Sequence, residues 1–317
     1  MATGLKDWPE FSPIGRTGVG LGRAGRHHGE ILQGLWWPEA AAHTDPVRCL
    51  VTLPVPEAGS EAHFRVAPGR QIEVHPAGKS KAARAARLAL DALDAKTYGG
   101  ALSLHCPIPM GLGLGSSTSD VLATLRAVCL ACGVRADATM LAQLAVRAEI
   151  ASDPLMFDGM VLFAQREGRV LEHWGHWIPE FLLLSVDTDP QSGGRDTVAL
   201  PQPRGDDLRS EYATLVQQGR TAFHAHDTSA IAAVATRSAE LHQTTAPTRG
   251  FDDLRALGTT NGALGLQISH SGTVAGLLFD PQIAPPTLTP LLPQLRALGM
   301  APLGISRTGG DSTAGIE

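Results

Sequence analysis

The sequence predicts a mixed fold of helices and strands, and three observations support this prediction. Hydrophobic residues make up 43% and charged residues 18% of the 317 positions, so the chain has enough apolar side chains to bury a core. Stretches of strand-like alternation are interspersed with stretches whose apolar residues recur at helical spacing. A glycine-rich turn separates one such strand from an apolar helix. At this length we expect one large domain or two smaller domains that share an interface.

The first hundred residues contain both periodicities. Leu50 to Val55 and Phe64 to Val74 have strand-like patterns that prolines and a glycine interrupt. Residues 79–95 are rich in strong helix formers, and their apolar positions recur at helical spacing. Leu102 to Cys106 alternates between apolar and polar residues as a strand does, and Pro107 ends it.

Two helices are predicted after the glycine-rich turn. The first begins at Ser116, and we expect it to be mostly buried because it carries only two charged residues as far as Ala131. Its apolar stripe consists of Val121, Leu122, Leu125, Val128, Cys129 and Cys132. The second runs from about Thr139 to Ile150 and ends before Asp153-Pro154, since a residue before proline avoids the helical region.

The second half of the chain predicts three strands and a helical region. Phe181 to Val186, Leu264 to Ile268 and Thr273 to Phe279 are apolar runs of strand length, and Arg209 to His242 has helical spacing. Gln191 to Leu208 contains glycines and prolines among mainly polar residues, so we expect a boundary loop there.

Charge and hydropathy exclude several classes of partner. The net charge of -5 and the pI near 6.2 give no general attraction to polyphosphate, so we expect no nucleic-acid partner. Met1 to Gly20 lacks an apolar core of the signal-peptide kind, and no uncharged apolar run reaches the roughly 18 residues of a bilayer span. We therefore expect a soluble cytoplasmic protein without a membrane partner. The four cysteines lie among apolar neighbours, as free buried thiols do, and the sequence leaves a homodimer open.

The segment from Pro109 to Asp120, PMGLGLGSSTSD, has the most specific pattern. Its three glycines remove side chains that would keep an anion from the backbone, and its hydroxyl residues stand where the helix begins, with the orphan N–H groups and the positive end of the helix dipole. These residues are Gly111, Gly113, Gly115, Ser116, Ser117 and Thr118. The pattern predicts a phosphate site, and an ordinary turn with Ser116 as N-cap is the alternative. No lysine follows Lys96, so we expect backbone dipoles, Mg²⁺ and arginine to meet the charge of a nucleotide.

Two further patterns are weaker. Gly20 to Gly25 is a formal GxGxxG, which would suggest a nicotinamide-dependent oxidoreductase, but it lacks the preceding apolar strand and the following helix of a dinucleotide site. The histidine pairs have no obvious third metal ligand nearby, so we expect them at the surface. These pairs are His27-His28, His173 with His176, and His224 with His226.

The string from Pro109 to Thr118 resembles the PxxxGLGSS signature of the GHMP kinases, which include galactokinase, homoserine kinase and mevalonate kinase. Gly25 to Gly34 (GRHHGEILQG) and His270 to Gly276 (HSGTVAG) agree in order and spacing with the outer motifs of that family. The sequences of these two segments are most similar to the L-threonine kinase branch associated with cobalamin side-chain synthesis. The likeness extends from about Gly20 to Phe279.

The resemblance implies an α+β fold of two domains, residues 1–190 and 191–317, with the active site in the cleft between them. It implies an ATP-dependent kinase that phosphorylates the hydroxyl of a small molecule, with L-threonine as the acceptor and Mg²⁺ as the metal. Another amino alcohol or hydroxy acid, or a ligand-binding relative without catalysis, are the alternatives. The implied ATP-binding residues are Pro109, Gly111, Gly113, Leu114, Gly115, Ser116, Ser117 and Thr118, and the implied Mg²⁺ ligands are Ser117 and Glu149.

Asp153 falls near the position where the family has the acidic residue that orients or deprotonates the acceptor hydroxyl, and Asp158 is a competing carboxylate. The related threonine kinases tend to read Glu-Pro-Thr-Asp where this chain reads Ile-Ala-Ser-Asp, at 150–153. Glu30 is expected to receive an ammonium group of the substrate, with a solvated turn residue as the alternative. The full set of implied substrate-binding residues is Glu30, Gln33, His270, Ser271, Gly272 and Thr273.

Overall fold

A computed structural model describes residues 18–38, 45–192 and 206–309 of the chain. It is 35% helical and 31% strand, which confirms the predicted mixed fold. Most of the expected boundary loop, Gln191 to Leu208, lies outside the described residues. In the part of the chain that is described, no helix combines the length and apolar character needed to cross a membrane.

The described elements comprise ten strands, seven α-helices and one 3₁₀ helix. The strands are β1 (Val19–Trp36), β2 (Val47–Pro68), β3 (Ile72–His75), β4 (Tyr98–His105), β5 (Met160–Ala164), β6 (Arg169–Gly175), β7 (Leu182–Asp187), β8 (Gly265–Ile268), β9 (Val274–Phe279) and β10 (Ala301–Arg307). The helices are α1 (Ser80–Ala92), α2 (Ser116–Ala131), α3 (Ala138–Glu149), α4 (Asp206–His224), α5 (Thr228–Gln243), α6 (Phe251–Thr260), η1 (Pro285–Leu288) and α7 (Leu291–Ala297).

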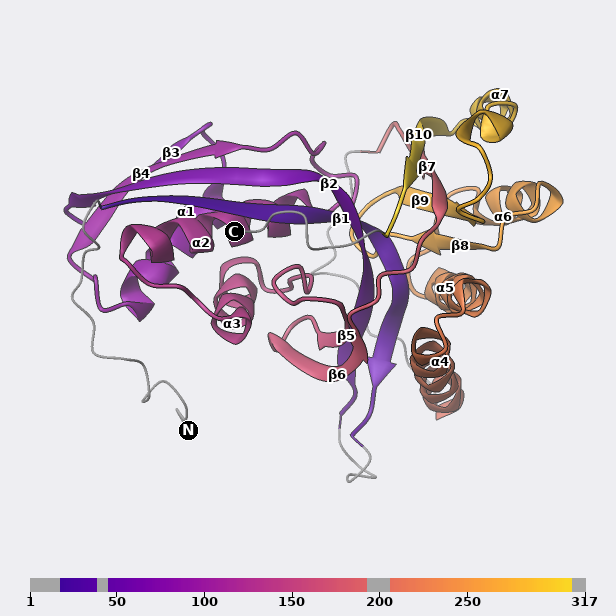
Figure 1. The fold of residues 1–317 in the computed structure, drawn as a ribbon, viewed down its shortest axis with the longest axis horizontal. Coiled ribbons are helices and arrows are strands. Elements are labelled where there is room, and N and C mark those ends of the chain that lie inside the picture. Colours follow the sequence, from indigo (N-terminus) through magenta and orange to yellow (C-terminus); the bar gives the residue numbers. More distant parts are fainter. Residues whose placement is uncertain (1–17, 39–44, 193–205, 310–317) are drawn as a thin grey trace.

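One sheet runs through the whole molecule, in the order β10-β7-β9-β8-β1-β2-β4-β3, and the hairpin β5-β6 attaches to β2. The antiparallel pair β1-β2 is long and curved, and it continues from one half of the molecule into the other (Figure 1). β8 joins β1 where Ile268 pairs with Glu30. The two halves of the sheet therefore meet in the middle of β1. β7, which precedes the expected domain boundary at residue 190, pairs with β9 and β10 of the second half.

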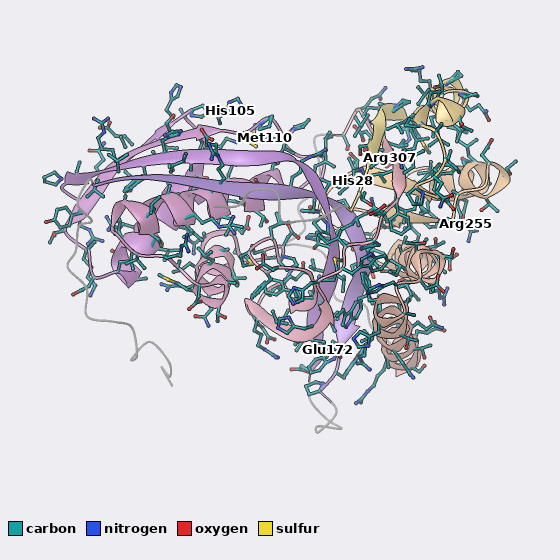
Figure 2. All side chains as sticks on the ribbon, in the orientation of Figure 1. His28, His105, Met110, Glu172, Arg255 and Arg307 are labelled. Carbon is teal, nitrogen blue, oxygen red and sulfur yellow. The ribbon has the colours of Figure 1, made fainter. Side chains whose placement is uncertain are left out.

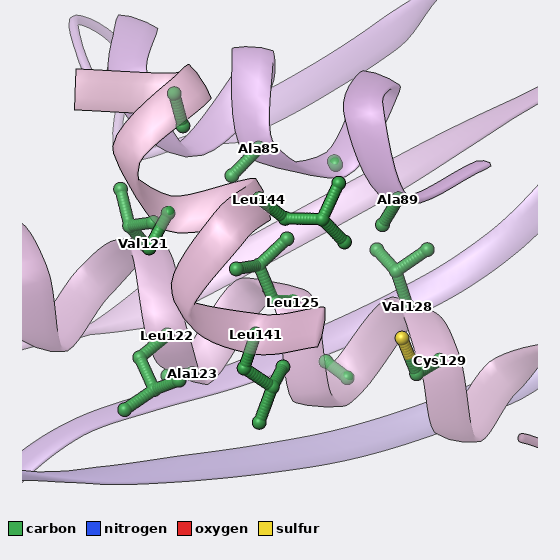
Figure 3. Packing of buried hydrophobic residues seen from close by; sticks show 14 of the residues in the cluster. Ala85, Ala89, Val121, Leu122, Ala123, Leu125, Val128, Cys129, Leu141 and Leu144 are labelled. Atoms are coloured by element: carbon green, nitrogen blue, oxygen red, sulfur yellow. The ribbon is translucent and has the colours of Figure 1, made fainter. Parts of the chain in front are cut away.

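The helices α1, α2 and α3 cover one face of the first half of the sheet (Figure 1). Figure 3 shows their apolar side chains packed together, with Leu125 and Val128 of α2 beside Leu144 of α3 and Ala89 of α1. The apolar stripe predicted for α2 is buried throughout. Cys129 and Cys132 are free thiols within this core, as expected.

The second half of the sheet carries its own layer of helices. α5 packs against β1 and β8, α4 packs against α5, and Trp174 fills the core beneath them. The predicted helical region from Arg209 to His242 is two helices, because Asp227 starts a new one by accepting a hydrogen bond from the Ala230 N–H at 2.9 Å. The strands predicted around residues 181–186, 264–268 and 273–279 are confirmed as β7, β8 and β9.

β1 is the largest difference from the sequence-based expectation. Its first part contains the GxGxxG segment, whose glycines have low strand propensity. A Cβ atom at Gly20 would lie 2.0 Å from the carbonyl oxygen of Ala127, and one at Gly22 would lie 2.0 Å from that of Ala123. The glycines thus let the backbone of α2 lie directly against the strand. They belong to an antiparallel strand and not to the strand-to-helix turn of a dinucleotide site.

The short elements β5, β6, β10, α6 and α7 were not predicted either. β5, β6 and β10 are strands of five to seven residues. β5 pairs with β6 and with the distant β2, and β10 pairs with the distant β7. Such pairing is decided by tertiary contacts more than by local pattern.

The contact between β1 and α2 predicts that alanine substitution of two glycines in the same strand changes the free energy of unfolding by different amounts. We expect Gly22→Ala to lower the free energy of unfolding by about 1–3 kcal/mol, because its Cβ meets backbone that has to shift. Gly25→Ala is the matched control, since a Cβ at Gly25 meets nothing within 4 Å, and we expect a change within about 0.5 kcal/mol. Urea unfolding of the two variants measures both values, and equal losses would contradict the close packing.

Candidate functional site

The glycine-rich loop leads directly into α2. Gly115 is the N-cap residue of that helix and has a left-handed backbone with φ of 77°. No side chain in the described part of the chain caps the helix. The N–H groups of the first helical turn therefore lack a capping acceptor, and the positive end of the helix dipole lies with them. This is the anion-binding arrangement that the sequence predicts for the loop.

The loop also packs against the turn between β8 and β9. The Val274 N–H donates to the carbonyl oxygen of Leu112 at 3.1 Å. A Cβ atom at Gly113 would lie 2.0 Å from Ser269 Oγ, and one at Gly272 would lie 2.0 Å from the carbonyl oxygen of Leu112. The structure thus brings the predicted nucleotide loop and the predicted substrate turn, His270 to Thr273, into direct contact.

Ser117 and Glu149 lie together at the start of α2. Ser117 Oγ donates to Glu149 Oε2 at 2.7 Å, and Thr118 Oγ1 lies 2.9 Å from Glu149 Oε1. A hydroxyl oxygen and a carboxylate oxygen at adjacent positions are hard ligands of the kind that Mg²⁺ prefers. The two residues expected to hold the metal are therefore brought together, although they are 32 positions apart in the sequence.

Two lysines at the start of α1 flank the same helix terminus. Lys81 Nζ lies 3.1 Å from Ser117 Oγ, and 56% of its side chain is exposed. Lys79 Nζ forms an ion pair with Asp120 Oδ2 at 2.7 Å. We expected arginine, and no lysine, to meet the charge at this loop. Lys79 and Lys81 were not foreseen there, because α1 reaches the loop only through the tertiary fold. Their position at the start of a predicted helix is a sequence feature that could have drawn attention to them.

Asp153 lies at the centre of a buried polar cluster. Its Oδ2 lies 3.0 Å from His27 Nε2 and accepts a hydrogen bond from Thr118 Oγ1 at 3.0 Å. Glu30 Oε1 lies 2.8 Å from His270 Nδ1 and 4.0 Å from His27 Nδ1. His270 Nδ1 is also 4.0 Å from Asp153 Oδ1. We call His27, Glu30, Asp153 and His270 the buried charge cluster.

Burial and pairing shift the proton affinities in the buried charge cluster in opposite directions. Burial alone lowers the pKa of His27, but the charge and hydrogen bond of Asp153, with Glu30, outweigh it and raise the value to about 9. Burial would raise the pKa of Asp153, yet His27 and His270 hold it well below its usual range. The pKa of His270 is raised despite its burial, mainly by Glu30. The neighbouring carboxylates therefore favour the protonated form of both histidines.

Glu149 behaves differently, because burial raises its pKa to about 7 and the nearby charge of Asp153 adds to the shift. Hydrogen bonds from Ser117 and Thr118 and the charge of Lys81 oppose the shift without cancelling it. Glu149 therefore exchanges its proton near neutral pH.

Three atoms of the buried charge cluster have no hydrogen-bond partner among the described residues: His27 Nδ1, Glu30 Oε2 and Asp153 Oδ1. Buried polar atoms without partners are rare, and they indicate a place for a ligand group. His27, Glu30 and Asp153 also offer possible metal-ligand atoms within 4.8 Å of one another. His27 Nε2 is already paired with Asp153 Oδ2, and this pairing favours the protonated ring, which cannot bind a metal. We therefore favour ion pairs over a metal at this position.

The end of α3 places both carboxylates. The helix stops at Glu149 because Ile150 adopts a left-handed backbone with φ of 74°, which is strained for a β-branched residue. The turn that follows brings Asp153 to Thr118, the residue that Glu149 also contacts. Asp158, the competing carboxylate, is exposed.

The other residues predicted to bind the substrate differ in how close they lie to the buried charge cluster. Gln33 lies on β1 beyond the cluster, where its backbone N–H donates to Ser238 Oγ of α5 at 2.8 Å. Ser271 Oγ lies 3.5 Å from Ser269 Oγ, and Thr273 Oγ1 donates to Asp187 Oδ1 at 2.6 Å. Glu30 is buried and paired with His270, so the alternative of a solvated turn residue is wrong.

The expected surface position of His27 and His28 is also wrong, since both are buried. His28 lies where β1 meets the second half of the sheet (Figure 2), and its ring nitrogens contact Gln267 and Ser185. The other two histidine pairs, at 173 and 176 and at 224 and 226, are exposed as expected. The missed signal was the apolar run directly after residue 30, which marks β1 as a central strand.

Comparisons with known proteins find related sequences over part of the chain. Residues 80–157 match the model of the GHMP kinases N terminal domain. The chain is 32% identical over 182 residues to an L-threonine kinase of Salmonella typhimurium, which covers 56% of this chain and 59% of that protein. It is 28% identical over 182 residues to an L-threonine kinase of Citrobacter freundii, covering 56% of this chain and 62% of that protein. The chain thus spans about three fifths of the length of the curated relatives it matches.

Solved structures share the fold over nearly the whole chain. A homoserine kinase from Cytophaga hutchinsonii has a TM-score of 0.69 at 16% identity and covers 94% of this chain and 97% of its own. A mevalonate kinase from L. major in complex with R-mevalonate has a TM-score of 0.63 at 17% identity and covers 96% of this chain and 100% of its own. The fold implied by the motifs is therefore confirmed.

The raised pKa of Glu149 predicts a pH-dependent stability in the metal-free protein. The neutral carboxyl contributes its stability fully below its unfolded pKa of 4.5, and this stability is lost as the pH rises through about 7. Glu149→Gln keeps a neutral side chain at every pH. We therefore expect the free energy of unfolding of the variant, relative to the wild type, to increase by roughly 2–3 kcal/mol between pH 4.5 and pH 8. Urea unfolding across this range measures it, and a constant difference would contradict the shift.

Proposed function

We propose, from the premise that this chain belongs to the GHMP kinase superfamily, that it transfers the γ-phosphate of ATP to a hydroxyl group of a small molecule. The observation that carries the proposal is the convergence of a helix N-terminus, Ser117, Glu149 and Asp153. Phosphoryl transfer needs an anion site, a metal-binding pair and a group that aligns the acceptor. Groups suited to each of these tasks lie around Thr118, which supports the proposal.

The nucleotide fits the loop from Pro109 to Thr118 for two reasons. Gly115 leaves the first turn of α2 without a side-chain cap, so backbone N–H groups are available to phosphate oxygens. Lys81, at the same terminus, adds a flexible and largely exposed cation that can reach a phosphate. The charge of ATP is then met by backbone dipoles and by lysine, in addition to the metal.

Ser117 and Glu149 are the residues that would hold Mg²⁺, since both offer oxygen ligands and are in contact. When bound there, Mg²⁺ neutralises charge that develops on the phosphate oxygens. Metal binding requires Glu149 to be ionised, and Lys81 at 4.0 Å favours that form. Ser117 then orients the carboxylate through its hydroxyl group.

Asp153 is the residue that we propose to align the acceptor. One of its oxygens has no partner among the described residues, so it can accept a hydrogen bond from an incoming hydroxyl group. The alcohol oxygen forms its bond to phosphorus, the bond from phosphorus to the bridging oxygen of ADP breaks, and the alcohol proton is released. Catalysis by this chain consists mainly of positioning and electrostatics.

L-threonine is the acceptor that we propose, because the matched relatives are L-threonine kinases. An amino acid with a hydroxyl group also suits the buried charge cluster. Among the described residues, Glu30 Oε2 has no partner and can accept from an ammonium group, and Asp153 Oδ1 has no partner and can accept from a hydroxyl group. We place the substrate cleft between residues 1–190 and 191–317, where His270 and Glu30 meet.

The acceptor panel tests this function. ADP release is measured with Mg-ATP and L-threonine, serine, homoserine, a simple amino alcohol and a hydroxy acid. We expect the highest kcat/KM with L-threonine. A preference for another member of the panel would support the kinase activity and contradict L-threonine as the acceptor. ATP binding without ADP release for every acceptor would contradict the kinase activity and support a ligand-binding protein.

Exchange of single carboxylates tests the assignment of Asp153. We expect Asp153→Asn to lower kcat by about 100-fold or more, while the affinity for Mg-ATP changes little, because the lost interaction is to the acceptor. Asp158→Asn is the matched control, since Asp158 is exposed five positions away. Loss of activity in the control and not in Asp153→Asn would reverse the assignment.

A further inference from the structure

His27 connects the nucleotide loop with the acceptor carboxylate. Its side chain is fully buried, and its Nε2 lies 3.0 Å from Asp153 Oδ2. The same edge of the ring fills the space next to Gly115, where a Cβ atom would lie 2.2 Å from His27 Cδ2 and 2.6 Å from Nε2. The ring therefore contacts both the residue before α2 and the carboxylate of Asp153.

The two oxygens of Asp153 have different surroundings because of this contact. Oδ2 has two hydrogen-bond partners, His27 Nε2 and Thr118 Oγ1. Oδ1 has none among the described residues, and the nearest charged atom recorded for it is His270 Nδ1 at 4.0 Å. One oxygen is thus committed to the protein, and the other is left for a ligand.

The groups around His27 favour its cationic form. Asp153 faces its Nε2, and Glu30 lies 4.0 Å from its Nδ1. His270 is the opposing cation, and it is paired with Glu30. A buried cation of this kind needs its partner, because an unpaired charge in the interior is costly.

We propose that His27 is a positioning residue for phosphoryl transfer: its imidazolium holds Asp153 Oδ2 so that Oδ1 faces the acceptor hydroxyl. This role rests on the proposed kinase function. His27 neither gives nor takes a proton in the step.

The pairing of His27 with Asp153 also determines when the acceptor hydroxyl loses its proton during phosphoryl transfer. An aspartate stabilised in its ionised form by His27 is a weak base, so it orients the hydroxyl group and does not remove its proton early. The alcohol oxygen bonds to phosphorus, the bond to the leaving ADP oxygen breaks, and the proton then moves from the alcohol oxygen to Asp153 Oδ1 and on to water. Late proton loss agrees with the loose transition state of phosphoryl transfer.

Two substitutions of His27 separate charge from shape. His27→Gln keeps a hydrogen-bond donor and removes the charge, and we expect kcat to fall about 100-fold while KM for Mg-ATP stays within about threefold. His27→Lys restores a cation, and we expect its kcat to be about tenfold higher than that of His27→Gln. A merely structural role predicts equal kcat for the two variants, since both replace the ring.

His28→Gln is the matched control, because it removes the neighbouring buried imidazole, whose contacts are with Ser185 and Gln267. We expect it to lower Tm as much as His27→Gln does but to reduce kcat less than about fivefold. If His27→Gln kept kcat within about threefold of the wild type, or if both control and variant lost activity equally, the positioning role would be overturned.

A second measurement does not depend on activity. ¹⁵N NMR of the histidine rings, assigned with His27→Gln, reports whether both nitrogens of His27 carry protons. We expect both to be protonated at pH 7.5 and one to be lost in Asp153→Asn. A neutral His27 in the wild type overturns the proposal even if the kinase is active. An inactive wild type with a protonated His27 instead overturns the proposed function, and with it the role of His27 in transfer, and leaves the ion pair standing.

Discussion

The packing of β1 on α2 is the contact on which the rest of the structure depends. Gly20 and Gly22 let the backbones of strand and helix touch, so the position of α2 is set by the strand. Farther along, the same strand brings the ring of His27 against Gly115, at the N-terminus of that helix. The register of β1 is irregular between His27 and Glu30, where the strand also begins to pair with β8. One strand therefore places the helix, the buried cation and the junction of the two halves.

Two large electrostatic effects act against each other in the buried charge cluster. Desolvation works against each ion, and the paired charges of the two histidines and two carboxylates offset that cost. The pairing is incomplete, since His27, Glu30 and Asp153 each keep one buried atom without a partner among the described residues. A fully satisfied cluster would be more stable, and it would have no polar atoms left to bind a ligand. The shortfall in hydrogen bonding is thus the feature that makes this part of the core suitable as a site.

Residues of five separate segments meet at the start of α2. The segments are β1 around His27, the beginning of α1 with Lys81, the glycine loop, the end of α3 with its two carboxylates, and the turn around His270. The family match covers residues 80–157 and so includes three of them, while β1 and the β8–β9 turn lie outside it. The residues that surround the proposed acceptor come mainly from these outer segments. Specificity for the acceptor is therefore a property of the assembled fold.

The sequence by itself determined the local elements and the chemistry of the loop. The helix from Ser116, its buried stripe, the glycines and the hydroxyl residues could be predicted, because spacing along one segment decides them. The tertiary structure alone decided that β1 is a strand, that His27 and His28 are buried, and that Lys79 and Lys81 lie at the loop. Each of these depends on partners from other segments of the chain. A local pattern holds no information about the charge or the backbone that it will meet.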